Sequence, residues 1–469
     1  MKCKFTVFIP FVLLFATVLS SCNDYLDVVP KGRKIPKTLA DFEALMRDEY
    51  TNQRFPIAQA TLLLNDYYER QENLNYSQLS RINYMWEEGT SRINFNNTSE
   101  GTYYTGYAAI STFNLLVQYV PTATEATEQQ RKTLVAQAKL ARAMHYFVLV
   151  NYYADTYEAA NAGSKLSVPL IESADISAPH KQVTIQEMYD YILLNITEAL
   201  PDLPADGATV VHATVAAAHA FRARVYLQMG NYPEALQAAD MALAENDQLF
   251  DWTAYYESYK DLIEQPGLYP SLPSPKGYDY VENYIFGHGE VAFASSENDV
   301  RVDRAGRFEP GDASFAARWK LRTLGNETYY QSITAGRYNQ GGITTAEVYL
   351  IKAECLARNN DLTGAMQALN AVRAKRILPQ SYTALSAANT RDAINLIRRT
   401  KENEMLFTIV AFADMRRFNK DPQYARTLTK KADNVTLSLK PESHLWTMPF
   451  PLGAINNPGN GTIKQNVNQ

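Results

Sequence analysis

The stretch that decides the fold covers residues 217–236. It reads Ala-Ala-His-Ala-Phe-Arg-Ala-Arg-Val-Tyr-Leu-Gln-Met-Gly-Asn-Tyr-Pro-Glu-Ala-Leu. The pattern predicts a helix, a tight turn and a second helix. Gly230 supplies the backbone freedom that the turn needs, and Pro233 suits the first turn of the second helix. Ala223 and Ala235 are small enough for the two helices to pack closely, so the stretch is predicted to form a helical hairpin.

This hairpin resembles a tetratricopeptide repeat, and the matching positions are Ala223, Gly230, Tyr232, Ala235 and Ala242. A second copy is predicted over 346–373, where Asn360 replaces the turn glycine, which asparagine can do. A third, more degenerate pair is expected from the helical patterns of 102–120 and 127–152. Since the copies are not contiguous, they do not form a regular solenoid.

The stretch between the two clear copies, about 246–345, is rich in proline, glycine and tyrosine. Loops of this length are rare unless they are functional. We therefore predict a mainly α protein with a helical repeat scaffold, about 38–245 and 346–420, and a loop-rich inserted subdomain with small strands. The tail, about 432–469, is expected to wrap the surface in extended form because its prolines disfavour helix.

The first 22 residues predict export. Lys2 and Lys4 precede an apolar run from Phe5 to Leu19, which is shorter than the roughly 20 residues that a membrane span needs. The following Ser20-Ser21-Cys22 completes a stretch that looks like a bacterial lipobox. Residues 1–21 are therefore predicted as a lipoprotein signal peptide and Cys22 as the lipidated residue. The alternative is a secretory signal with a coincidental cysteine.

Composition restricts the function classes. The chain has 469 residues, of which 46% are hydrophobic and 20% charged, as in a globular protein. The formal charge of −5 becomes −7 once Lys2 and Lys4 are removed, which argues against a nucleic-acid partner. Cys355 is then the one remaining thiol besides Cys22, so an intrachain disulfide is not expected.

Seven segments in order are similar to the SusD/RagB family of outer-membrane nutrient-binding lipoproteins. They are Cys22–Lys31, Ala136–Tyr153, Thr184–Pro204, Ala217–Ala242, Ala346–Arg376, Asp414–Phe418, and Pro449–Pro451 with Asn457-Pro458. The chain departs from the family at Thr408–Ala411, where members often carry Glu-Gly-x-Arg. An ion pair that the family has there is expected to be missing.

The resemblance implies a single SusD-like domain over 22–469. It also implies a lipid-anchored protein on the outer face of the outer membrane, with Cys22 as the anchor. Its partners would be an oligosaccharide ligand and a SusC-like TonB-dependent porin. The protein would capture the glycan and pass it to the porin without cutting it.

A glycan surface needs flat aromatic rings for sugar faces and polar side chains for hydroxyl groups. Aromatic and polar residues gather in two regions, and the family builds its sugar platform from loops in these regions. The candidate residues are Tyr278, Tyr280, Tyr284, Arg318 and Trp319 in the insertion, and Asp66, Tyr76 and Trp86 upstream. The alternative is that these rings only pack the subdomain.

Two other functions stay open as alternatives: a glycoside hydrolase or lyase of the same uptake system, and a structural lid of the porin that binds no sugar. The adjacent Glu87-Glu88 is more typical of a solvated face than of a hydrolase pair. The six histidines show no metal-binding spacing, and no cofactor is predicted. A structural calcium site from Asp279, Asn298, Asp299 and Asp303 is conceivable but unspecific.

Overall fold

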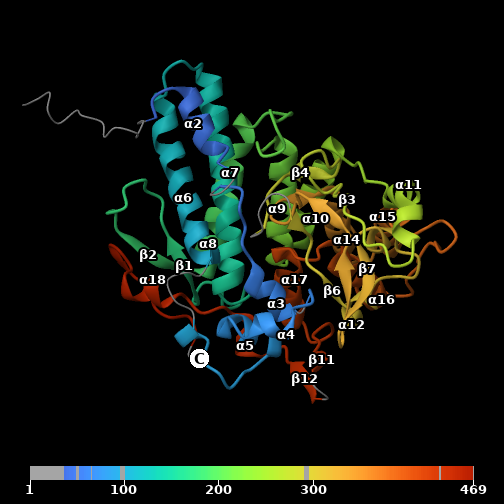
Figure 1. The fold of residues 1–469 in the computed structure, drawn as a ribbon. Coiled ribbons are helices and arrows are strands. Elements are labelled where there is room, and N and C mark those ends of the chain that lie inside the picture. Colours follow the sequence, from blue (N-terminus) through green and yellow to red (C-terminus); the bar gives the residue numbers. More distant parts are fainter. Residues whose placement is uncertain are drawn as a thin grey trace, which may run out of the picture.

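The computed structural model describes residues 36–48, 52–64, 66–95, 101–289, 295–432 and 435–467. The predicted signal peptide and Cys22 lie outside these residues. Long helices form one side of the molecule, and the remaining helices pack beside them with several small sheets around the edge (Figure 1). The expectation of a mainly α fold is confirmed.

The decisive stretch forms the predicted hairpin. Helix α9 spans Val215–Gln228 and α10 spans Tyr232–Glu245. Gly230 has a φ of 73°, a left-handed conformation that glycine adopts at little cost. Ala223 and Ala235 are fully buried, which allows the close approach of the two helices.

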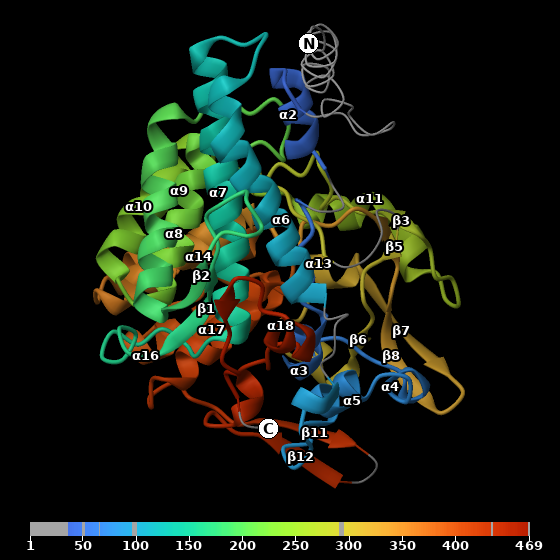
Figure 2. The ribbon, with the colours of Figure 1, turned by 90° about the vertical axis from the view of Figure 1, so that its left-hand side faces the viewer.

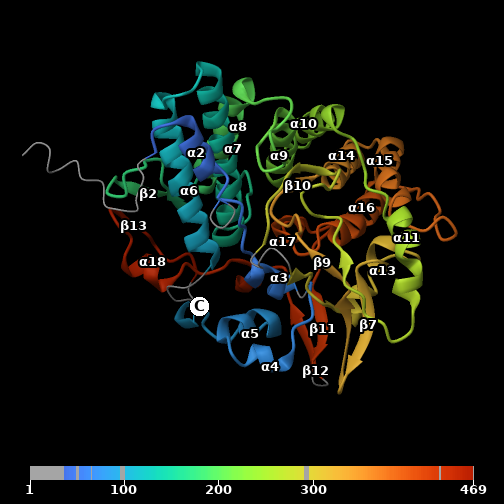
Figure 3. The same ribbon diagram turned by 45° about the horizontal axis from the view of Figure 1, so that its top comes forward.

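The second hairpin consists of α14 (Thr345–Arg358) and α15 (Leu362–Ala374). Asn360 occupies the left-handed turn position with a φ of 62°, as predicted. Helix α14 packs against α10, so the two hairpins are neighbours in space although the insertion separates them in sequence (Figure 3).

The third helical group is longer. Helix α6 (Gly101–Tyr119) packs along α7 (Glu128–Tyr153), and α8 (Ile185–Ala199) packs on the other side of α7. Thr184 caps α8 as a capping box: its Oγ1 accepts from the Glu187 N–H at 3.1 Å, and Glu187 Oε2 accepts from the Thr184 N–H at 2.7 Å.

The other helices are shorter and cover the edges of this scaffold. They are α2 (Leu39–Met46), α3 (Ala58–Leu64), α4 (Gln71–Leu74), α5 (Gln78–Met85), α11 (Trp252–Glu264), α12 (Val302–Ala305), α13 (Ala313–Ala316), α16 (Thr390–Glu404), α17 (Ile409–Asn419) and α18 (Leu452–Asn456). Short 3₁₀ turns add η1 (Ile93–Phe95), η2 (Val120–Thr122), η3 (Leu200–Asp202) and η4 (His444–Trp446).

The inserted segment holds α11 to α13 and three small sheets. Their strand orders are β3–β9–β5, β6–β8–β7 and β10–β4. The strands are β3 (Leu272–Pro273), β4 (Asn283–Ile285), β5 (Ser295–Ser296), β6 (Val300–Arg301), β7 (Trp319–Leu324), β8 (Glu327–Ser332), β9 (Thr334–Gly336) and β10 (Ile343–Thr344). Arg376 ties this segment to the scaffold, since its guanidinium lies 2.8 Å from both Glu282 and Glu404.

The tail differs from the extended surface strap that its prolines predict. Strand β12 (Val435–Leu439) pairs with β11 (Leu428–Ala432), and β13 (Gly461–Thr462) joins β2 (His180–Thr184), which also pairs with β1 (Leu166–Leu170). Between them the chain enters the core, where Leu445 and Phe450 are fully buried. The buried Arg92 holds this segment by donating to the Thr447 carbonyl at 2.7 Å.

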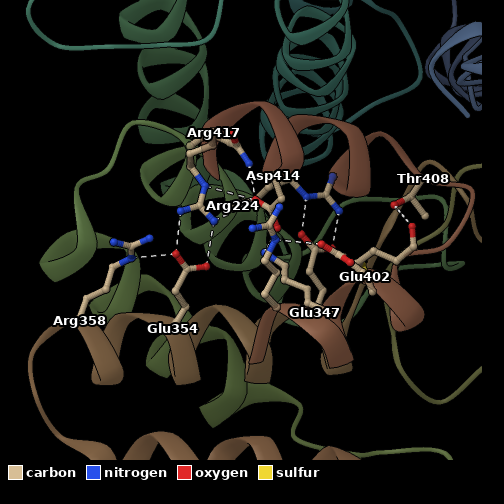
Figure 4. A network of polar contacts seen from close by, with 12 residues as sticks. Arg224, Glu347, Glu354, Arg358, Glu402, Thr408, Asp414 and Arg417 are labelled. Carbon is tan, nitrogen blue, oxygen red and sulfur yellow. Dashed lines mark hydrogen bonds and ion pairs between the residues drawn. The ribbon is translucent and has the colours of Figure 1, made fainter. Parts of the chain in front are cut away.

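A buried ionic network joins the second hairpin to α17 (Figure 4). Glu354 accepts from Arg417 at 2.7 and 2.9 Å and from Arg358 at 2.9 Å. Arg417 also lies 3.1 Å from Asp414, which in turn pairs with Lys401 at 2.7 Å. The segment that resembles the family around Asp414–Phe418 is therefore an internal junction.

The departure at Thr408–Ala411 falls at the start of α17. Thr408 Oγ1 donates to the Met405 carbonyl at 2.7 Å, while Ile409 and Val410 are buried in the core. Thr408 and Ala411 stand where the family often has glutamate and arginine; Thr408 makes this local hydrogen bond and Ala411 is buried, so neither can form that ion pair. Within the described residues, we find no helix with the length and apolar character that a bilayer crossing requires.

Candidate functional site

A cleft of about 450 Å³ lies where three distant segments of the chain meet. Its lining comprises Arg47 and Gln53 from the region after α2, residues 208–211 from the connection before α9, and Tyr278-Asp279 from the insertion before β4. Its size is within the range of small-molecule sites. Scaffold and insertion both contribute, so the cleft forms only where these three segments pack together.

Gln53 is placed by backbone pairing with the insertion. The His288 N–H donates to the Gln53 carbonyl at 2.8 Å, and the Phe55 N–H donates to the His288 carbonyl at 2.9 Å. Gly341 is required nearby because an added Cβ would overlap the Phe55 ring. These contacts fix the segment that carries Gln53.

The side chain of Gln53 is 6% exposed, and its Oε1 has no hydrogen-bond partner among the described residues. Its Nε2 is within 3.5 Å of the Arg47 carbonyl. An unpaired buried acceptor costs about 1–3 kcal/mol, so native structures rarely keep one without a reason.

The wall formed by 208–211 is tied down at both ends. The Phe286 N–H donates to the Val210 carbonyl at 2.9 Å, and Thr209 Oγ1 lies 2.7 Å from His212 Nδ1. Burial, reinforced by the nearby Arg47, lowers the pKa of His212. The imidazole is therefore neutral at pH 7 and can keep its contact with Thr209.

The insertion contributes a ring and a carboxylate. Tyr278 is half-buried, with the Arg337 guanidinium 4.5 Å from its ring centroid and Phe286 packed edge-on at 4.6 Å. Asp279 is exposed. Asn283 fixes this turn because its Nδ2 donates to the Gly277 carbonyl at 2.8 Å.

The cleft is thus lined by an aromatic ring, a cation, a carboxylate and the side chain of Gln53. This set suits the binding of a ligand with several hydroxyl groups. Among the described residues that line the cleft, Asp279 is the only carboxylate.

The two tryptophans predicted to stack on a ligand lie in the core. Trp86 is 6% exposed, and its Nε1 donates to the Leu63 carbonyl at 2.7 Å. Trp319 is 2% exposed, its Nε1 donates to the Asn298 carbonyl at 2.9 Å, and the Arg318 guanidinium lies 4.0 Å from its ring centroid. We correct the prediction for both residues, because rings covered by protein cannot stack on a ligand in this conformation.

The other predicted residues of the insertion, apart from Tyr278, are also internal. Tyr280 and Tyr284 are buried, and the Tyr284 hydroxyl donates to the Asn246 carbonyl. Arg318 is 4% exposed and pairs with Glu297, with Nε 2.8 Å from Oε2. Their partners are protein groups, so we do not include them in the candidate surface.

Asp66 and Tyr76 have contrasting environments. Asp66 is buried and lies 3.3 Å from Arg304; burial raises its pKa. Tyr76 is 89% exposed in the turn between α4 and α5. These two helices lie at the opposite end of the molecule from α2, which leads into the cleft (Figures 1 and 2). The structure therefore does not bring Tyr76 and Tyr278 together.

Sequence reasoning missed Arg47 and Gln53. Both lie in a polar stretch without a recognisable motif, and Gln53 reaches the cleft through backbone pairing with His288, more than half the chain away. The polar run before Phe55-Pro56 was the available signal, since it marks a loop.

Two of the four calcium candidates have other partners. Asp299 accepts from the Ser332 N–H at 2.8 Å, and Asp303 accepts from Arg301 at 2.8 Å. In the described ranges, histidine, cysteine, aspartate and glutamate do not gather in threes with a geometry that could hold a metal ion.

A second cleft, of about 300 Å³, lies beside the first half of α7. Its charged residues pair with one another: Lys132 lies 2.8 Å from Glu128, and Lys139 lies 2.8 Å from Glu198. Because its lining is satisfied internally, the cleft at Gln53 is the better candidate.

Comparison with protein families gives two matches. Residues 24–227 match a family described as starch-binding and associating with the outer membrane, and residues 289–468 match the SusD family. Comparison with curated protein sequences gives no match.

Solved structures share the fold. A SusD superfamily protein from Bacteroides thetaiotaomicron aligns with a TM-score of 0.66 and 17% identity, covering 92% of this chain and 100% of its own. A SusD-like carbohydrate binding protein from Bacteroides vulgatus aligns with a TM-score of 0.65 and 14% identity, covering 92% of this chain and 100% of its own. Surface glycan-binding protein A from Bacteroides uniformis aligns with a TM-score of 0.65 and 16% identity, covering 92% of this chain and 99% of its own.

Proposed function

The chain belongs to the SusD/RagB family, and from this we propose that it is a cell-surface glycan-binding lipoprotein. It captures an oligosaccharide and passes it to a SusC-like TonB-dependent transporter in the outer membrane. Support comes from the family description, starch-binding and associating with the outer membrane, and from the carbohydrate- and glycan-binding proteins that share the fold.

The observation that carries the binding proposal is the cleft in which Gln53 meets Arg47, Tyr278 and Asp279. Arg47 and Asp279 supply hydrogen-bonding groups for sugar hydroxyls, and the Tyr278 ring supplies a surface for an apolar sugar face. All four residues line one cleft, which supports a single binding site for the glycan there.

The test is affinity gel electrophoresis of the purified protein across a panel of polysaccharides that includes starch, followed by titration with an oligosaccharide of any glycan that retards it. Arg47→Ala and Asp279→Ala should each weaken binding about tenfold, since hydrogen bonds to charged groups are the stronger ones. Both side chains are exposed, so the fold should be unaffected.

Tyr76→Ala is the matched control for the surface at the other end of the molecule. Its affinity should equal that of the wild type. Loss of binding in Tyr76→Ala, with the Arg47 and Asp279 variants unchanged, would move the glycan to the α4–α5 surface.

The same material separates the alternative functions. New reducing ends after prolonged incubation with the bound glycan would identify a hydrolase, and unsaturated ends would identify a lyase. A protein that binds none of the glycans but copurifies with a porin would be a structural lid.

The anchor and the transporter need their own experiments. Labelled palmitate should enter the protein, and Cys22→Ala should abolish both this labelling and membrane retention. A TonB-dependent porin should copurify with the wild type from detergent-solubilised outer membranes. Retention of unlabelled Cys22→Ala protein on cells would refute the anchor.

A further inference from the structure

One helical residue contacts the chain on both sides of Gln53. His145, in the middle of α7, places Nε2 2.9 Å from the carbonyl oxygen of Asn52. Its ring also stacks on Phe55, with centroids 4.3 Å apart and planes at 16°. These two contacts lie on either side of Gln53 in the sequence.

The hydrogen-bond pattern determines the tautomer of His145. A carbonyl oxygen only accepts, so Nε2 must carry the proton and donate it to Asn52. The imidazole is 2% exposed, with Phe113 5.7 Å away, and burial lowers its pKa to about 4. At neutral pH the ring is therefore uncharged and keeps a single N–H on the side that faces Asn52.

Asn52 is itself buried and is held on its other side. Its N–H donates to the Asp48 carbonyl at 2.9 Å, and its side-chain Nδ2 donates to the Leu45 carbonyl at 2.5 Å. His145 thus connects the long helix α7 to a segment that α2 and the insertion also hold, and that α6 contacts where Thr102 donates to the Pro56 carbonyl at 2.7 Å.

We propose that His145 is a positioning residue of the ligand cleft, which holds Asn52 and Phe55 and thereby fixes Gln53 between them in the cleft lining. The consequence for binding rests on the proposed glycan function, whereas the positioning itself does not.

Two variants separate the hydrogen bond from packing. His145→Gln keeps an N–H donor near the position of Nε2, whereas His145→Met keeps apolar volume without a donor. We expect His145→Met to bind glycan roughly fivefold more weakly, which corresponds to one lost hydrogen bond, and His145→Gln to retain most of the affinity. Equal affinities in the two variants would overturn the proposal.

Hydrogen exchange followed by mass spectrometry gives a readout that needs no ligand. Residues 52–57 should exchange faster in His145→Met than in the wild type, and His145→Gln should restore their protection. Ile192→Ala, a core variant in α8 away from the cleft, is the control for general destabilisation. It should leave protection of 52–57 and glycan affinity unchanged, and equal loss of protection in all three variants would contradict a local role.

A measurement on the wild type covers the case in which His145→Met does not fold. Nitrogen-15 NMR of histidine-labelled protein should show the Nε2–H tautomer for His145 at pH 7. An Nδ1–H tautomer or a charged ring would refute the proposal. If the wild type binds no glycan, the proposed function fails, while exchange and tautomer still decide the role of His145.

Discussion

Replacing Glu354 by glutamine tests the buried network of Figure 4. Glu354 is 1% exposed and accepts from Arg417 at 2.7 and 2.9 Å and from Arg358 at 2.9 Å. Removing one partner of a buried pair costs about 3–5 kcal/mol because the other charge stays buried. Arg417 still has Asp414 at 3.1 Å, so we expect a loss near the lower end, about 3 kcal/mol.

The assay is urea-induced unfolding monitored by tryptophan fluorescence, which gives the free energy of unfolding of each variant. Adding Arg417→Met to Glu354→Gln should recover part of the loss, because it removes the orphaned cation. Glu198→Gln, which breaks the more exposed pair with Lys139, is the control and should be close to neutral. A loss below about 1 kcal/mol for Glu354→Gln, or a double variant less stable than the single one, would refute the reasoning.

The pH dependence of this effect has a defined sign. Burial alone would raise the pKa of Glu354, but Arg417 and Arg358 outweigh it and hold the pKa well below the ordinary carboxyl value. A carboxyl whose pKa is lower in the folded than in the unfolded protein stabilises the fold at pH values above its unfolded-state pKa. This stabilisation is lost as the pH falls towards its folded-state pKa. The difference between wild type and Glu354→Gln should therefore shrink in acid.

Three further predictions concern other parts of the chain. Because burial lowers the pKa of His145 from 6.5 to about 4, the unfolded state takes up the proton first, so stability should fall as pH drops from 6.5 towards 4, and less in His145→Gln. A pH-independent difference between the two proteins in urea unfolding would contradict this. Gly342→Ala should be strongly destabilising because an added Cβ would overlap the Ile285 carbonyl, whereas Gly163→Ala, with nothing within 4 Å, should be nearly neutral; equal melting temperatures would refute the packing there. Burial raises the pKa of the Cys355 thiol to about 12, so its peptide should stay unlabelled by a thiol reagent until the protein unfolds, and rapid labelling of native protein would show that the thiol is accessible.

The helical scaffold could be predicted because its rules are local. Gly230 and Asn360 mark two turns, Thr184 and Glu187 form a capping box, and small alanines mark close helix contacts, all within a few residues of sequence. The structure confirms each of these features. The order of the helical repeats along the chain, and the large insertion between the two clear copies, could also be predicted from the sequence.

The site was predicted less well because it depends on long-range pairing. Trp86 and Trp319 sit among polar residues in the sequence, yet both rings are buried, and the backbone carbonyls of Leu63 and Asn298, about twenty residues away, accept from their N–H groups. Tyr278 does line a cleft, but its neighbours Arg47 and Gln53 come from another part of the chain. Such a contact leaves no periodicity or spacing for sequence reasoning to detect.

The most direct test of glycan capture is titration of the wild type, Gln53→Leu and Gln228→Leu with an oligosaccharide of the glycan that retards the protein in gels. Gln228 is another buried glutamine, and it contacts Asp414 instead of the cleft. The account predicts that Gln53→Leu binds roughly fivefold more weakly, as expected for about 1 kcal/mol, while Gln228→Leu binds like the wild type. Unchanged affinity in Gln53→Leu, or equal loss in both variants, would contradict it.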